Sequence, residues 1–76
     1  MTALRPLESG SLPPISKREL ECLKLTANGL TSEAIAEQLH LSVHTANQYL
    51  TNSAQKLDAV NRMHAVAKAL RMGLID

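Results

Sequence analysis

Apolar residues recur every three or four positions in four stretches of the chain, which short polar breaks separate. This spacing is typical of amphipathic α-helices. We predict helices over about 17–28, 32–39, 43–57 and 62–72, and hence an all-α, compact four-helix domain. The expected inward positions of the first three helices are Cys22, Leu23, Thr26 and Ala27; Ile35, Ala36 and Leu39; and Val43, Ala46, Leu50, Ala54 and Leu57.

Capping residues mark the predicted helix ends. Ser16 and Glu19 have the spacing of a capping box, and Ile15 and Leu20 can form the hydrophobic staple around it. The other helices begin with residues that commonly cap an N-terminus, and two helices end where glycine permits a left-handed turn. The expected N-caps are Thr31, Ser42 and Asn61, and the glycines are Gly29 and Gly73.

The second and third predicted helices are joined by only His40, Leu41 and Ser42. So short a connection makes the two helices cross sharply, which is the geometry of a helix-turn-helix. Ala36 is small where the two helices approach. We expect His40 to adopt a positive φ at this turn, because histidine tolerates that conformation better than most residues.

The outer face of the third helix carries amides and hydroxyls, and no acidic residue occurs between Glu37 and Asp58. A merely solvated helix face is usually rich in Lys and Glu, whereas Asn, Thr and Ser are poor helix formers. In the major groove, Asn and Gln can pair bidentately with adenine, and Thr can bond to either base type. We therefore interpret Asn47, Gln48 and Thr51 as base-reading residues.

Phosphate contacts should lie on either side of this face, at hydroxyls, ring groups and one cation, together with backbone amides at the start of the third helix. The sequence leaves two roles open for Lys56, a phosphate contact or a solubilising lysine. The candidate backbone-contacting residues are Thr31, Ser42, His44, Thr45, Tyr49 and Lys56.

The composition of the chain argues against several classes of function. Eight Lys and Arg against seven Asp and Glu give a net charge of +1, which neither requires nor excludes nucleic acid. The single cysteine, Cys22, suits an apolar core position in a reducing, cytoplasmic protein, and no apolar run is long enough for a membrane span. The three histidines lack metal-ligand spacing, and no catalytic constellation is visible, so we expect no enzyme, metal or cofactor.

The stretch from residue 15 to 76 resembles the DNA-binding domain of the LuxR family of bacterial transcription regulators, also called the GerE-like domain. The resemblance rests on SKRELECL, NGLTSEAIAEQL, LSVHTANQYL, QKLDAVNR and AVAKALRMGLI taken together. The Thr-x-Asn element and the ending look most like quorum-sensing members that respond to acyl-homoserine lactones. The resemblance implies that the third helix enters the major groove of double-stranded DNA and that the fourth helix mediates dimerisation. Residues 1–14 hold all three prolines and lack periodicity, so we expect a flexible leader or interdomain linker there. A signal, if there is one, would be read by an N-terminal domain outside this chain.

The chain departs from the family pattern in ways that weaken its attraction to phosphate. Many relatives place Lys or Arg at the positions of Asn47 and Thr51, and fewer cations mean fewer released counterions. We expect weak binding by a monomer and tight binding only by a pair. A protein-interaction module of the same fold with little DNA affinity is the alternative.

The fourth predicted helix has two apolar stripes, of which one must face the core. We assign Ala65, Val66 and Ala69 to the core. The other stripe then forms a self-complementary patch for a homodimer, made of Met63, Ala67 and Leu70.

Overall fold

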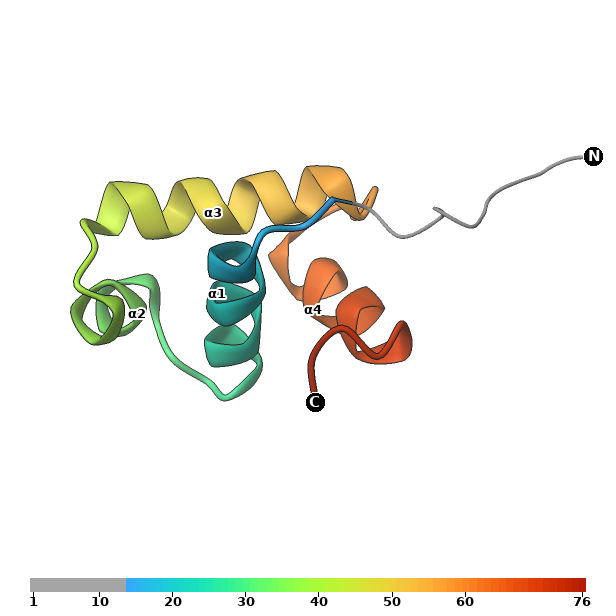
Figure 1. Ribbon diagram of the computed structural model, residues 1–76, viewed down its shortest axis with the longest axis horizontal. Coiled ribbons are helices and arrows are strands. Elements are labelled where there is room, and N and C mark those ends of the chain that lie inside the picture. The colour runs from blue at the N-terminus through green and yellow to red at the C-terminus, as the bar shows by residue number, and fades with distance from the viewer. Residues whose placement is uncertain (1–13) are drawn as a thin grey trace, which may run out of the picture.

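A computed structural model describes residues 14–76 of the chain, which fold into four helices and contain no strand. Figure 1 shows α1 (Lys17–Ala27), α2 (Ser32–Leu39), α3 (Val43–Lys56) and α4 (Arg62–Arg71). The all-α prediction is confirmed, and each predicted end lies within one residue of the observed one. The predicted leader lies, apart from Pro14, outside the described residues.

Side-chain caps begin all four helices, as predicted. The Ser16 backbone N–H donates to Glu19 Oε1 over 2.8 Å, and the Glu19 N–H donates to Ser16 Oγ over 3.1 Å, which completes the capping box. Thr31, Ser42 and Asn61 each accept a hydrogen bond from a backbone N–H in the first turn of the helix that follows. These caps satisfy amides that the helices themselves leave without a partner.

The turn between α2 and α3 uses the left-handed conformation expected at His40, with φ 60° and ψ 46°. The Leu41 N–H donates to the Ala36 carbonyl over 2.8 Å, which closes the end of α2. Gly29 and Gly73 also have positive φ, of 93° and 73°. Asp58, after α3, adopts φ 56°, which the sequence analysis did not anticipate.

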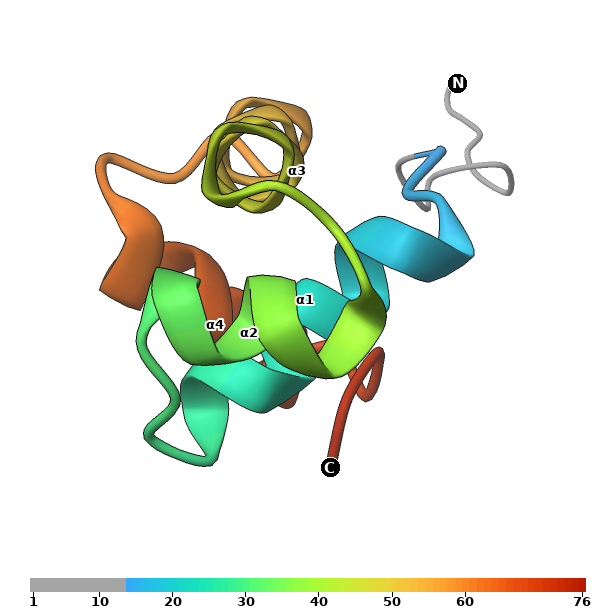
Figure 2. The same ribbon diagram turned by 90° about the vertical axis from the view of Figure 1, so that its left-hand side faces the viewer.

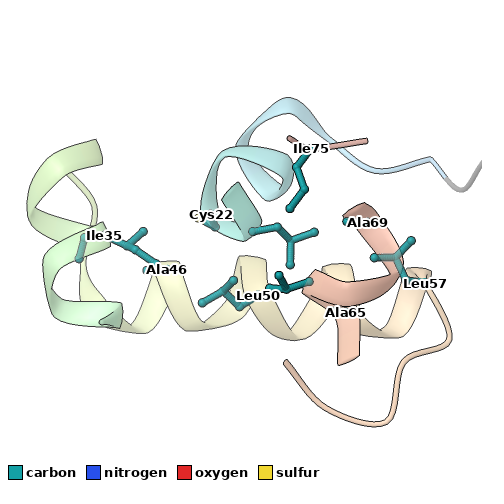
Figure 3. Packing of buried hydrophobic residues seen from close by; sticks show 11 residues of the cluster. Cys22, Ile35, Ala46, Leu50, Leu57, Ala65, Ala69 and Ile75 are labelled. Carbon is teal, nitrogen blue, oxygen red and sulfur yellow. The ribbon is translucent and has the colours of Figure 1, made fainter. Parts of the chain in front are cut away.

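The core lies between α3 and the other three helices, each of which packs against it (Figure 3). Among the described residues its members are Cys22, Leu23, Ile35, Ala36, Ala46, Leu50, Leu57, Ala65, Val66, Ala69 and Ile75. The assignment of Ala65, Val66 and Ala69 to the core is confirmed. Burial raises the pKa of the Cys22 thiol, which keeps it protonated and unreactive.

Two inward predictions need correction, and one buried residue was not predicted. Ala27 is exposed, because α1 ends there and the chain turns away, and the half-buried Leu25 packs against the core from that turn instead. Val43 is 39% exposed, because it is the first residue of α3. Ser53 is fully buried although the sequence analysis gave it no inward role; its hydroxyl donates to the Leu50 carbonyl over 2.8 Å.

A lysine side chain helps to hold the C-terminal end of α3. Lys68 of α4 donates to the carbonyls of Leu57 and Asp58, at 2.8 and 3.1 Å, where a helix C-terminus favours positive charge. None of the described helices is long and apolar enough to span a membrane.

Candidate nucleic-acid interface

The long helix α3 lies along one side of the molecule and leaves one face uncovered. Figure 1 shows it running above α2, α1 and α4, and Figure 2 shows it end-on with the other helices beneath it. No acidic residue occurs anywhere in α3. The exposed side chains on this face are those of His44, Gln48, Thr51, Asn52 and Gln55.

Gln48 and Thr51 are the predicted base readers that point into solvent. Both are exposed, and neither side chain forms a hydrogen bond with another residue in the range 14–76. The donors and acceptors of these two side chains are therefore free to meet a base edge. Bidentate pairing with adenine requires one donor and one acceptor from the protein side chain.

Asn47 is placed differently, on a flank of α3 where it is half-buried. Its Oδ1 accepts from Ser32 Oγ over 2.6 Å and from Arg62 Nη2 over 3.1 Å. Arg62 Nη1 donates to Ser32 Oγ over 3.0 Å, so the three side chains form a closed ring. An arginine only donates, so the Asn47 atom that faces it must be the oxygen. The bidentate adenine contact expected of Asn47 is not available in this conformation.

Several predicted phosphate-contacting residues gather at the start of α3. Ser42 Oγ accepts from the Thr45 N–H over 3.0 Å, and the Ser42 hydroxyl donates to Thr45 Oγ1 over 2.9 Å. This arrangement leaves the hydroxyl hydrogen of Thr45 free to donate outward, beside the exposed His44. The positive end of the helix dipole adds to the attraction for an anion.

Thr31 and Tyr49 lie farther from this point. Thr31 is exposed at the start of α2, where its Oγ1 accepts from the Ala34 N–H over 3.2 Å. Tyr49 is half-buried and its ring packs against the core from the middle of α3.

Lys56 has a partner that the sequence analysis missed. Its ammonium lies 2.8 and 3.1 Å from the two carboxylate oxygens of Glu19, whose side chain is only 4% exposed. Burial raises the pKa of the Glu19 carboxyl, but hydrogen bonds from Lys56 and Ser16 and the Lys56 charge outweigh it, so the pKa lies below the ordinary value. Lys56 is the counter-ion of a buried acid, a role that was not predicted for it.

A signal for this pair was present in the sequence. Glu19 lies three and four positions before Cys22 and Leu23, which places an acid on the inward stripe of the first helix. An inward carboxylate needs a cation, and Lys56 is the only Lys or Arg in α3. The sequence contains no comparable signal for the contacts of Arg62, because its partners are neutral side chains from two other helices.

The outward stripe of α4 is exposed, as expected from its assignment away from the core. Met63 is 67% exposed, Leu70 is 46% exposed, and Ala67 is half-buried. These side chains are not needed to complete the core of one chain.

A three-residue turn between α2 and α3, with an uncovered and acid-free third helix, defines a helix-turn-helix domain. Residues 13–69 match the family model described as bacterial regulatory proteins, luxR family. Because the match spans most of the chain, the protein belongs to this family. It is therefore a helix-turn-helix domain of a family described as bacterial regulatory proteins.

The relatives place the domain in both short and long regulators. The chain is 34% identical to the spore germination protein GerE of Bacillus subtilis over 73 residues, covering 96% of this chain and 99% of GerE. It is 45% identical over 62 residues to the HTH-type quorum sensing-dependent transcriptional regulator VjbR of Brucella abortus, covering 82% of this chain and 24% of VjbR. The chain thus spans about a quarter of the length of that relative.

The fold agrees with a solved structure. The structure of the transcription factor GerE superimposes with a TM-score of 0.78 at 30% sequence identity, covering 80% of this chain and 91% of that one. This likeness confirms the helix-turn-helix fold.

Proposed function

We propose that α3 enters the major groove of double-stranded DNA and that Gln48 and Thr51 read base edges there. The observation that carries this proposal is the free, exposed and acid-free face on which these two side chains lie without a partner among the described residues. A good bidentate contact discriminates between bases by about 1–3 kcal/mol, which is enough for selection at one position. Asn47 remains a base reader in this proposal, but only through its amino group.

Thr31, Ser42, His44, Thr45 and Tyr49 are proposed to contact the DNA backbone around this face. The first four are hydroxyls or a ring close to helix N-termini, where phosphate binding is favourable. We leave Lys56 out of this proposal, because its ammonium is paired with the Glu19 carboxylate.

The domain is proposed to act as a homodimer through Met63, Ala67 and Leu70. Two copies would place two α3 helices on half-sites about one helical turn apart on a two-fold symmetric operator. The exposure of Met63 and Leu70 supports this assignment. Replacing Met63 with Asp should abolish cooperative DNA binding while helix content stays unchanged; unfolding of this variant would show that the side chain has a structural role.

The longer relatives suggest the wider setting of the domain. VjbR is named as a quorum sensing-dependent transcriptional regulator. By analogy, we propose that a signal-sensing domain preceding this one controls it, and that it acts in the cytoplasm, where bacterial DNA lies.

A titration of the chain with a two-fold symmetric DNA duplex, followed by amide NMR shifts, tests the proposal. Shifts concentrated in residues 42–52 support reading by α3. The alternative, a protein-interaction module, is favoured by one observation: the exposed face of α3 carries no unpaired lysine or arginine. No shift in residues 42–52 at any DNA concentration would support that alternative.

A further inference from the structure

The side chains of Arg62, Ser32 and Asn47 form a cluster, here called the Asn47 cluster, that joins three helices. Arg62 is the first residue of α4, Ser32 is the first residue of α2, and Asn47 lies in the first turns of α3. Figure 2 shows α2 and α4 beneath the same helix, α3. These are the one pair among the four helices whose backbones do not pack directly on each other. The Arg62–Ser32 hydrogen bond therefore links two helices that otherwise meet only through α3 and α1.

The partners of Arg62 are unusual for an arginine that is partly removed from solvent. The residue is half-buried, yet no carboxylate in residues 14–76 lies within 4.0 Å of its guanidinium. Its two Nη atoms instead donate to Ser32 Oγ and Asn47 Oδ1, at 3.0 and 3.1 Å. The flat fork of the guanidinium suits two acceptors at fixed separation, which a lysine ammonium cannot bridge in the same way.

The cluster fixes which end of the Asn47 carboxamide faces outward. Ser32 Oγ accepts from Arg62, so its own hydrogen is available for Asn47, and it donates to Oδ1 over 2.6 Å. With two donors aimed at Oδ1, turning the carboxamide over would place its NH₂ group against both of them. The Nδ2 amino group is therefore held on the other side, where it forms no hydrogen bond with any described residue.

We propose that Arg62 is a positioning residue that sets base preference by making Asn47 a reader that only donates. This inference rests on the proposed function. A free Asn pairs with adenine by donating to N7 and accepting from the N6 amino group. An Asn whose oxygen is already occupied leaves that amino group without an acceptor. Guanine, which presents the two acceptors N7 and O6, becomes the better partner.

Single-residue variants test the inference through base preference. The substitution Arg62→Lys keeps the charge but removes the fork, and Arg71→Lys, at the exposed last residue of α4, is the matched control. Binding is measured by competition among two-fold symmetric duplexes in which each base pair is varied in turn. Asn47→Ala identifies the position that Asn47 reads, because preference is lost there alone.

At that position the wild-type chain should prefer guanine to adenine. Arg62→Lys should move the adenine-to-guanine ratio toward adenine by at least about fivefold, the lower end of a bidentate contact. Arg71→Lys should leave the ratio unchanged. Ser32→Ala, a smaller change that also removes one donor to Oδ1, should shift the ratio in the same direction and serves if Arg62→Lys does not fold.

Two results overturn the inference while leaving the proposed function intact. One is a wild-type preference for adenine at the position that Asn47 reads; the other is a ratio within twofold of wild type in both variants. The side-chain amide signals of Asn47 in DNA-free protein give an independent check, since Arg62→Lys should shift them and Arg71→Lys should not. Unchanged signals in Arg62→Lys overturn the inference. If Arg62→Lys shifts these signals but the wild-type chain shows no base preference at any position, the proposed function is refuted, and with it the role of Arg62 in selection.

Discussion

The two flanks of α3 each hold a polar side chain that the sequence assigned to DNA and the structure ties to the protein. On one flank Lys56 binds the buried carboxylate of Glu19. On the other flank Asn47 accepts from Ser32 and Arg62. The first contact is between full charges of which one is buried, and the second is between a cation and neutral groups. The two flanks therefore differ in what they contribute.

The difference between the two flanks suggests that one contributes to the stability of the domain and the other to the recognition of DNA. A buried carboxylate that loses its cation is left without compensation, so the Lys56–Glu19 pair should contribute to the stability of the fold. Asn47 uses only its oxygen in the cluster and keeps an amino group for an outside partner. The Lys56 flank is expected to control the free energy of unfolding, and the Asn47 flank to control which base is selected.

The largest expected effect is that of Lys56→Met. It should lower the free energy of unfolding by about 2–3 kcal/mol, somewhat less than the ~3–5 kcal/mol of a fully buried pair, because the Lys56 side chain is 34% exposed. Urea denaturation measures this change. The control is Lys24→Met, which removes an exposed pair with Asp76 and should cost no more than about 0.5 kcal/mol. Equal effects of the two substitutions would contradict the assignment of Lys56.

Next in size is a contrast between neighbours on α3. Asn47→Ala removes the shared acceptor of Ser32 and Arg62 and should destabilise the domain by about 1–2 kcal/mol. Gln48→Ala touches no described partner and should stay within about 0.5 kcal/mol of wild type, while it weakens operator binding by about 1–3 kcal/mol. Thermal unfolding and duplex titration of both variants measure the two quantities. If Gln48→Ala were the more destabilising variant, the division between the flank and the exposed face would be wrong.

A smaller effect should appear on acidification. The folded pKa of Glu19 lies below its ordinary value, so the stabilisation is complete above the ordinary value and is lost as the pH falls below it and through the folded pKa. Glu19→Gln retains the capping geometry and should flatten this part of the profile. The measurement is the free energy of unfolding between about pH 5 and pH 2 for both proteins. Parallel profiles would mean that other acids cause the loss.

Local patterns in the sequence were sufficient to predict most of the fold. The capping box of Ser16 and Glu19, the left-handed turn at His40 and the core stripe of α4 each depend on residues within a few positions of one another. Such interactions are encoded by spacing along the chain, so periodicity and capping rules find them. The error at Ala27 arose at a helix end, where periodicity no longer determines which side faces the core.

The site was less predictable because its decisive contacts are long-range. Glu19 and Lys56 are 37 positions apart, and Ser32 and Arg62 are 30 apart. No spacing rule within one helix connects such residues. The sequence identified Gln48 and Thr51 as outward by periodicity alone, but the same periodicity placed Asn47 with them. Periodicity within α3 cannot reveal that α2 and α4 each supply a donor to Asn47.

The smallest expected effect concerns salt, and it distinguishes the two roles first considered for Lys56. Removing a lysine that binds phosphate makes the negative slope of log K against log salt concentration shallower by about 0.9. Because Lys56 is bound to Glu19, Lys56→Met should leave that slope unchanged at a temperature where the variant remains folded by circular dichroism. Glu19→Gln gives the converse test, since it retains a hydrogen-bond acceptor but removes the opposing charge. If freeing Lys56 in this way steepens the slope, its ammonium lies within reach of the DNA, and Glu19 then screens a cation that would otherwise strengthen non-specific binding.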